Sequence, residues 1–394
     1  LVIDINKWLF FYIFTAKYNT LWISNMNKKT INVTQPFLPP LNEYYDYLEK
    51  IWDNKWLTNN GEFHQKLEEA LCLELNVNHI SLFSNGTLAL LIALKAFEII
   101  EDNAEIITTP YSFVATTHAI KWNNFVPKFV DVKLSDGNID EKEIEKSITS
   151  KTKAILPVHV YGLPANVNAI DKIAQKYNLK VLYDAAHAFG VKHNNESILK
   201  FGDLSVLSFH ATKVFNTFEG GAIISKSKEM KEKIDDLKNF GFKDETTIST
   251  IGINAKMNET QAAMGLLQLK YFDQIKQKRK IIIDFYTNEL INTEGVRCLD
   301  IDPKITWNYA YFPIFIKNSF HLSRDQLYDK FKANGINVRR YFYPIIPDFT
   351  PYIKKEDREK YTNARLLSNQ VLCLPIYPEL SQDDQIRILS ILKK

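Results

Sequence analysis

The run LSVLSFHATKVFNTFEGG (residues 204–221) places a lysine, Lys213, shortly after a buried apolar strand. Upstream of it, YDAAHAFG (residues 183–190) places an aspartate, Asp184, directly after another apolar strand. A lysine amine forms a Schiff base with the aldehyde of pyridoxal 5'-phosphate (PLP), and an aspartate keeps the pyridine nitrogen of that cofactor protonated. The two segments therefore predict a PLP enzyme with Lys213 and Asp184 at its chemical centre.

A third segment, HISLFSNGTLALLIALKAF (residues 79–97), adds a candidate phosphate site. It reads as a short strand, a polar turn with Gly86 and Thr87, and an apolar-periodic helix. The free N–H groups and the positive dipole end of a helix N-terminus suit a phosphate. The alternative is an ordinary turn, in which Thr87 caps the helix and Gly86 supplies backbone freedom. In combination with Asp184 and Lys213, we favour phosphate binding.

Length and composition agree with a cytoplasmic enzyme. At 394 residues, of which 45% are hydrophobic, the chain is long enough for one large domain and a smaller one. A formal net charge of +3 makes no electrostatic case for nucleic acid or a membrane as partner. The three cysteines are widely spaced and odd in number, so they match neither a disulfide framework nor a zinc site. We therefore expect reduced thiols and no metal.

Residues 1–25 stand apart from the rest of the chain. They are rich in aromatic and aliphatic residues, but the longest uncharged run, residues 8–16, is far shorter than the ~20 residues of a membrane helix. Asp4 precedes the apolar stretch and no small-residue cleavage site is evident, which argues against a signal peptide. We interpret this segment as an upstream or non-native extension, with Met26 as the physiological first residue. The alternative is a short amphipathic anchor on a membrane face.

Apolar strand-like runs alternate with helical stretches along the rest of the chain. This pattern is typical of a mostly parallel sheet that is covered on both faces. The candidate strands are residues 80–83, 105–108, 127–132, 154–160, 181–184, 204–209 and 222–225. They predict an α/β fold with a seven-stranded sheet in the large domain.

A long helical pattern, over about residues 258–292, leads into a smaller α+β domain. That domain has a candidate strand near residues 310–316 and a candidate helix over residues 323–334. We expect the N-terminal segment and the PLP-binding large domain to span residues 26–270, and the small C-terminal domain to span residues 271–394.

The order of these motifs resembles the DegT/DnrJ/EryC1/StrS family of sugar aminotransferases, which have the aspartate aminotransferase-like fold (PLP fold type I). The resemblance runs from about Val33 to the C-terminus. The matching segments are VTQPFLPP, KWLTNNG, SNGTLALLIAL, TTPYSFVATTHAI, PVHVYGLPANV, YDAAHAFG, SFHATKVFNTFEGGA and GINAKMNETQAAMGLLQL. They occur in the family's order, and they imply its fold and its cofactor, PLP.

The resemblance assigns further residues to the cofactor. Phe113 matches the aromatic residue that lies over the cofactor ring, and His187 matches a Gln or His that donates a hydrogen bond to the ring hydroxylate. Ser208 matches a serine that reaches the cofactor phosphate. Asn254 matches an asparagine that reaches that phosphate from the neighbouring subunit, which implies a homodimer with shared active sites. From the residues alone, Phe113 reads as a core residue and His187 as a histidine without a special role.

The surroundings of Lys213 resemble those in enzymes that aminate C4 of a dTDP-4-keto-6-deoxyhexose. There the lysine lies in SFHATK and is followed by EGG, whereas C3-aminating relatives more often carry an SFYP-type sequence. The resemblance implies transfer of an amino group from L-glutamate to C4 of a nucleotide-linked 4-keto-6-deoxyhexose, with a product of the dTDP-4-amino-4,6-dideoxyglucose type. It also implies a role in surface polysaccharide synthesis, such as the O-antigen of lipopolysaccharide. The alternatives are C3 amination of the 3-keto isomer and, from another class, a non-catalytic PLP-binding regulatory protein.

In such a reaction Lys213 is both the Schiff-base partner and the group that shuttles the proton. That role requires an amine whose pKa is brought down toward neutrality, which a desolvated cationic site favours. For the nucleotide sugar, the resemblance points to KWLTNNG (residues 55–61) and RRYFYPI (residues 339–345). The candidate substrate residues are Thr58, Glu219, Arg339, Arg340 and Tyr343. A guanidinium group binds phosphate oxygens bidentately, but a solvated basic turn is the alternative for each arginine.

Overall fold

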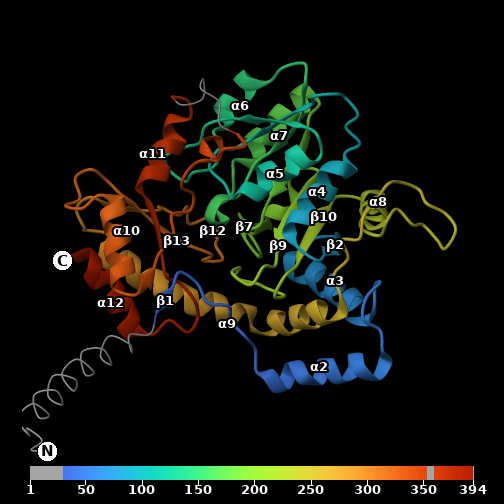
Figure 1. The fold of residues 1–394 in the computed structure, drawn as a ribbon, viewed down its shortest axis with the longest axis horizontal. Coiled ribbons are helices and arrows are strands. Elements are labelled where there is room, and N and C mark those ends of the chain that lie inside the picture. Colours follow the sequence, from blue (N-terminus) through green and yellow to red (C-terminus); the bar gives the residue numbers. More distant parts are fainter. Residues whose placement is uncertain (1–29, 353–358, 394) are drawn as a thin grey trace, which may run out of the picture.

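The computed structural model describes residues 30–352 and 359–393, which form a large α/β unit and a smaller α+β unit (Figure 1). Residues 1–25, which were interpreted as an extension, lie outside the described residues. Within them, no helix combines the length and the apolar character that crossing a membrane requires.

A central sheet forms the core of the large unit. In the described part of the chain it has seven strands in the order β2-β10-β9-β6-β5-β3-β4. Strand β10 is antiparallel to both of its neighbours, and the other pairs are parallel. The strands are β2 (His79–Phe83), β3 (Glu105–Thr108), β4 (Val126–Phe129), β5 (Thr152–Leu156), β6 (Lys180–Asp184), β9 (Leu204–Ser208) and β10 (Gly221–Ser225). The predicted seven-stranded, mostly parallel sheet is confirmed.

Two predicted strands end several residues earlier than expected. The candidate over residues 127–132 ends as β4 at Phe129, and the candidate over residues 154–160 ends as β5 at Leu156. The apolar run over residues 154–160 continues past Leu156, where β5 ends. The next residue, Pro157, has no backbone N–H to donate to a continuing ladder. Hydrophobicity alone therefore overestimated the length of this strand.

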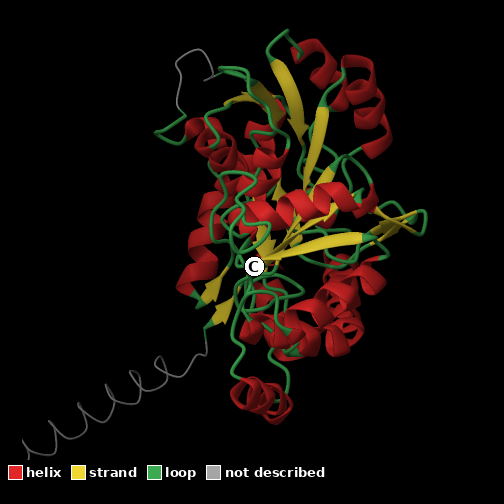
Figure 2. Ribbon diagram, turned by 90° about the vertical axis from the view of Figure 1, so that its right-hand side faces the viewer, coloured by secondary structure: helices red, strands yellow, loops and turns green. Residues whose placement is uncertain are grey.

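Alternate residues along the strands face different layers of helices, because successive side chains of a strand point to opposite faces. Leu204, Val206 and Ile223 pack with α4, α5 and α8, whereas Leu207 and Ala222 pack with α3 and α9. Figure 2 shows helices on both sides of the strands. The helices of this unit are α3 (Glu62–Leu75), α4 (Gly86–Ala96), α5 (Val114–Trp122), α6 (Glu141–Ser147), α7 (Val167–Tyr177), α8 (Lys228–Lys238) and α9 (Glu259–Leu290).

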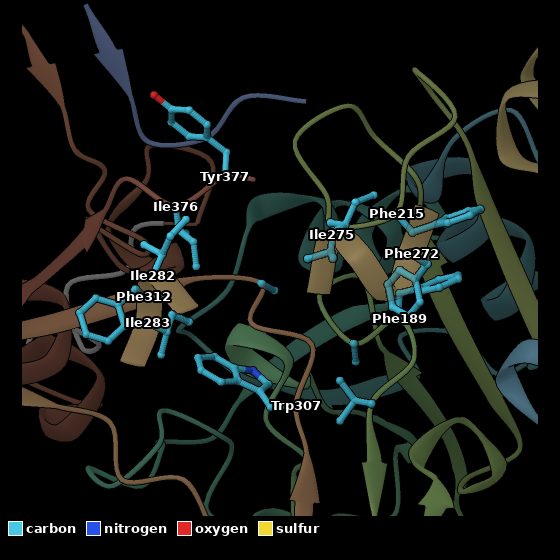
Figure 3. Packing of buried hydrophobic residues seen from close by; sticks show 14 of the residues in the cluster. Phe189, Phe215, Phe272, Ile275, Ile282, Ile283, Trp307, Phe312, Ile376 and Tyr377 are labelled. Atoms are coloured by element: carbon cyan, nitrogen blue, oxygen red, sulfur yellow. The ribbon is translucent and has the colours of Figure 1, made fainter. Parts of the chain in front are cut away.

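Helix α9 belongs to the cores of both units. In the first half of the helix, Phe272 packs edge-on against Phe189 with ring centres 4.9 Å apart. Further along, Ile282 and Ile283 lie in the same apolar cluster as Phe312 of the smaller unit (Figure 3). The predicted boundary between residues 270 and 271 falls inside this helix, and the domain limits stay a prediction.

The smaller unit is built on a second sheet of antiparallel strands, in the order β11-β13-β15. The candidate strand near residues 310–316 corresponds to β13, and the candidate helix over residues 323–334 corresponds to α10. The elements of this unit are β11 (Val296–Cys298), β13 (Phe312–Ile316), α10 (Arg324–Ala333), β14 (Ile336–Asn337), α11 (Thr362–Gln370), β15 (Val371–Leu374) and α12 (Gln382–Lys393).

The start of the described chain joins both units. Strand β1 (Ile31–Asn32) pairs in parallel with β14 of the smaller unit, and helix α2 (Leu41–Asn54) lies along α9 (Figure 1). The remaining elements are β7 (Lys192–His193), β8 (Glu196–Ser197) and β12 (Ile305–Thr306), which form a small sheet, and the short 3-10 helices η1 (Val160–Gly162), η2 (Ile198–Lys200) and η3 (Ile346–Asp348).

The first residue of α9 also caps α3. The buried carboxylate of Glu259 accepts hydrogen bonds from the backbone N–H groups of Phe63, at 2.8 Å, and His64, at 2.9 Å. Such N–H groups have no partner inside their own helix, and the positive end of the helix dipole favours a negative charge there. The contact therefore fixes the N-terminus of α3 against α9.

We expect Glu259→Gln to lower the free energy of unfolding by about 1–3 kcal/mol, because a buried N–H group loses its charged acceptor. Glu62→Gln is the matched control, since Glu62 lies in the first turn of α3 but has an exposed side chain. That control should change the free energy of unfolding by less than about 0.5 kcal/mol. Urea denaturation of both apoproteins measures the difference, and equal losses in the two variants would contradict the cap.

Candidate active site

A cavity lies at the carboxyl ends of two neighbouring parallel strands. Strand β6 ends at Asp184 and β9 ends at Ser208, and their register pairs Asp184 with Val206. Ligands of α/β sheets bind at this edge because the loops that follow parallel strands meet there. The cavity has a volume of about 890 Å³.

Most of the residues predicted for the cofactor border this cavity. They are Gly86, Thr87, Phe113, Asp184, His187, Ser208 and Lys213. Glu219, predicted to contact the substrate, borders it too, and its carboxylate lies 3.5 Å from Nε2 of His210. The fold thus gathers side chains that are widely separated in the sequence.

The amine of Lys213 lies in a largely dehydrated part of the cavity. It donates a hydrogen bond to the hydroxyl of Tyr311 at 3.2 Å. Loss of hydration lowers the pKa of Lys213 to about 8, and the negative charge of Asp184 opposes this shift. A useful fraction of the amine is therefore neutral near pH 7, as a group that accepts and returns a proton requires.

The carboxylate of Asp184 is buried and held from two sides. The hydroxyl of Thr116 donates a hydrogen bond to one oxygen at 2.8 Å, and the N–H of Ala186 donates to the other at 3.1 Å. Burial raises the pKa of Asp184, while these hydrogen bonds and the charge of Lys213 act in the opposite direction. A cationic group placed beside this carboxylate would favour its ionised form.

The imidazole of His187 is buried between aromatic rings. It stacks on Phe342 with ring centres 6.0 Å apart and lies 4.7 Å from the ring centre of Tyr311. Burial, with a smaller effect from Lys213, holds the pKa of His187 well below its usual value, so the ring is neutral. Its Nδ1 atom has no hydrogen-bond partner among the described residues.

Small residues keep the N-terminus of α4 close to the end of β9. Asn85, rather than Thr87, caps the helix, and its side chain accepts a hydrogen bond from a first-turn N–H. A Cβ atom on Gly86 would lie 3.0 Å from the Cβ of Ser208. A Cβ atom on Gly221 would lie 2.8 Å from the backbone of Gly86. Glycine at both positions therefore lets the helix N–H groups and the Ser208 hydroxyl face the same space.

These groups fit the chemistry of PLP. The helix N-terminus and Ser208 suit its phosphate, the amine of Lys213 suits its aldehyde, and the carboxylate of Asp184 suits a protonated pyridine nitrogen. The unpartnered Nδ1 of His187 is a buried polar atom that a ring oxygen of the cofactor would satisfy. The role of each residue toward the cofactor stays a prediction.

Five predicted residues do not border the cavity of this chain. They are Thr58, Asn254, Arg339, Arg340 and Tyr343. The ring of Tyr343 packs against two guanidinium groups. Its centre lies 4.2 Å from Cζ of Arg324 and 4.7 Å from Cζ of Arg340. Arg340 in turn donates a hydrogen bond to Asp325 at 2.9 Å. The roles of these residues in substrate or phosphate binding remain predictions.

Sequence reasoning did not single out several residues that border the cavity or hold one of its lining residues. Tyr311 comes from the aromatic run WNYAYFP (residues 307–313), which has no motif of its own. Thr116 lies in the segment PYSFVATT, three positions after Phe113 and in the first turn of a helix. Its nearness to a predicted cofactor residue could have marked it as a candidate. Lining residues that were assigned no role include Ser112, His210, Thr212 and Tyr311. Tyr341 and Phe342 also line the cavity, and they lie in the segment of residues 339–345 that was predicted for the substrate.

Comparison with known proteins gives the same family along almost the whole chain. The model of the DegT/DnrJ/EryC1/StrS aminotransferase family matches residues 41–393. A dTDP-4-amino-4,6-dideoxy-D-glucose transaminase from Shigella dysenteriae is 53% identical, over 93% of this chain and 99% of that protein. A transaminase of the same name from Escherichia coli is 50% identical, over 93% of this chain and 99% of its own length.

Solved structures agree with this result. The structure of DesI in the presence of its TDP-sugar product superposes with a TM-score of 0.88 at 30% identity, covering 93% of each chain. Helicobacter pylori PseC, an aminotransferase involved in the biosynthesis of pseudoaminic acid, superposes with a TM-score of 0.86 at 30% identity. That match covers 93% of this chain and 100% of PseC.

We expect Gly86→Ala to weaken the affinity for PLP by roughly tenfold, or about 1.4 kcal/mol, because the added Cβ presses on Ser208. Thr87→Ser is the control, since it keeps a hydroxyl at the neighbouring position and adds no atom. Spectrophotometric titration of each apoprotein with PLP measures the affinity, and thermal unfolding of the apoproteins verifies that both fold. An unchanged affinity in Gly86→Ala would mean that the phosphate binds elsewhere.

Proposed function

This chain belongs to the DegT/DnrJ/EryC1/StrS aminotransferase family and is a transaminase, and we propose that it transfers an amino group from L-glutamate to C4 of a dTDP-linked 4-keto-6-deoxyhexose. The product is of the dTDP-4-amino-4,6-dideoxyglucose type. The single observation that carries the chemistry is the partly dehydrated amine of Lys213, facing the same cavity as the buried carboxylate of Asp184. Two relatives that share half of the sequence carry the name of this reaction, which supports the choice of substrate.

When bound, PLP supplies an aldehyde for the amino group and a ring that accepts electrons. Lys213 holds the cofactor, removes the Cα proton of the amino donor, and later returns a proton to C4 of the sugar. Asp184 keeps the pyridine nitrogen protonated, and His187 contacts the ring oxygen. The amino group leaves glutamate, whose Cα gains an oxygen from water and departs in 2-oxoglutarate. The amino group then replaces the C4 oxygen of the sugar, which leaves as water. We place this enzyme in the cytoplasm, in the supply of amino sugars for a surface polysaccharide such as the lipopolysaccharide O-antigen.

We also propose that the enzyme is a homodimer with shared active sites. Asn254, assigned to the phosphate, is exposed and does not border the cavity of its own chain. The segment between α8 and α9 that carries it also exposes apolar side chains. Those exposed in this segment are Phe240, Phe242, Ile248, Ile251 and Ile253. A second copy that covers this apolar surface would bring Asn254 to the partner's cavity.

Purified holoenzyme incubated with L-glutamate and dTDP-4-keto-6-deoxyglucose should form an amino sugar whose nitrogen is on C4, as NMR of the product will show. The 3-keto isomer should react at least about tenfold more slowly. Lys213→Ala is the matched control and should abolish turnover because no other amine replaces the proton shuttle. Preferred amination at C3, or comparable turnover in Lys213→Ala, would overturn the proposal.

Subunit exchange tests the shared site. Asn254→Ala should retain PLP poorly, and Lys213→Ala should be inactive. In a mixed dimer, one site has its own Lys213 and the partner's intact Asn254, so activity should recover to about one quarter of wild type after random exchange. Mass spectrometry of differently tagged subunits verifies the exchange. Proven exchange without recovery would show that each site is built within one chain.

A further inference from the structure

The hydroxyl of Tyr311 is the hydrogen-bond partner of the Lys213 amine, and the transamination chemistry above does not use it. The amine donates to this hydroxyl at 3.2 Å and lies 5.7 Å from the centre of the ring. Three aromatic groups surround the ring, with centres 4.7 Å away for His187, 5.6 Å for Tyr341 and 6.3 Å for Tyr161. The phenol therefore has little freedom to turn away from the amine.

We propose that Tyr311 is a positioning residue that holds the Lys213 amine in the cavity whenever this amine is not bonded to the cofactor. This proposal rests on the proposed function, in which Lys213 is released in each half of the reaction and then moves a proton. A free lysine side chain has four rotatable bonds, so its amine samples many positions unless a contact holds it. One fixed acceptor keeps its amine near the atoms between which the proton travels.

The residues that precede Tyr311 in the chain, residues 308–310, are hydrogen-bonded to α9 and to the loop after β6. Arg279 of α9 is buried, and its guanidinium donates to the carbonyl oxygen of Tyr309 at 2.8 Å and to that of Ala310 at 2.7 Å. The side-chain amide of Asn308 donates to the carbonyl oxygen of His187 at 2.8 Å. These contacts hold the backbone that leads to Tyr311, in the smaller unit, against both α9 and the loop after β6.

Tyr311 holds the amine without exchanging a proton with it. Loss of hydration raises the pKa of Tyr311 well above its usual value, so the phenol stays protonated at neutral pH. Lys213 as a neutral amine takes the Cα proton of the donor and becomes an ammonium group, one hydrogen of which the phenol oxygen accepts. The ammonium would pass this proton on to the cofactor before the first half of the reaction ends. In the second half the amine would take up a proton again and deliver it to the sugar carbon, and Tyr311 is unchanged after each half.

The direction of this hydrogen bond predicts a shift in the pKa of Lys213. An acceptor stabilises the ammonium form, so its removal should lower the pKa further below the value of about 8 that burial and Asp184 set. The phenylalanine variant keeps the aromatic ring and removes only the acceptor. The titratable groups that border the cavity around Lys213 are Asp184, His187, His210, Glu219, Tyr311 and Tyr341.

The first test uses the full-length apoprotein and does not depend on the substrate. Acetic anhydride labels Lys213 in its neutral form, and mass spectrometry of the Lys213 peptide gives the rate at each pH. We expect Tyr311→Phe to lower the pKa of Lys213 by about one unit, which corresponds to one hydrogen bond. Tyr341→Phe is the matched control, because Tyr341 borders the same cavity but makes no hydrogen bond to Lys213 among the described residues.

The second test uses the holoenzyme. We expect Tyr311→Phe to lower kcat by about tenfold while KM for both substrates changes less than about twofold, since the hydroxyl is assigned to the proton-transfer step. Glutamate deuterated at Cα should then show a larger isotope effect than in the wild type, and PLP affinity should be unchanged. A pKa for Lys213 that is unchanged, raised, or equally lowered in Tyr341→Phe would overturn the proposal. Failure of the proposed function would instead appear as absent turnover in the wild type.

Discussion

The parallel pairing of β6 with β9 is the constraint on which the site depends. It brings Asp184 and the residues that follow Ser208 to one edge of the sheet, although they are far apart in the chain. Because side chains alternate along a strand, a shift of one residue in this register would turn Asp184 away from the cavity. The helices on both faces hold the register, since Leu204 and Val206 face one layer and Leu207 faces the other.

Dehydration acts on the two central groups in opposite directions. It raises the pKa of Asp184 and lowers that of Lys213, so each group is shifted toward its neutral form. At Asp184 the hydrogen bonds from Thr116 and Ala186 and the charge of Lys213 oppose this shift, and at Lys213 the charge of Asp184 opposes it. A cofactor with a cationic ring nitrogen and an aldehyde suits both groups. The hydrogen bonds from Thr116 and Ala186 fix the carboxylate before any ligand arrives, which limits the reorganisation needed for binding.

The sheet and many cavity residues could be predicted from the sequence because short stretches of neighbouring residues identify them. Short continuous apolar runs mark strands that are buried on both faces of the sheet, and Asp184, Ser208 and Lys213 each lie at or just after the end of such a run. Tyr311 could not be predicted in this way, because it is 98 positions from Lys213 and reaches it only through the packing of the smaller unit on α9. Residues such as Asn254, whose proposed partner is another copy of the chain, carry no local signal of that partner.

The glycine pair after Glu219 has a consequence for how such sequences are compared. A side chain on Gly220 would collide with Thr217, and one on Gly221 with the start of α4, so both positions are required by packing rather than by proton transfer. A relative that lost its lysine would still need both glycines to close this part of the sheet. The pair is therefore a marker of the scaffold, whereas the proposed activity depends on Lys213 and Asp184.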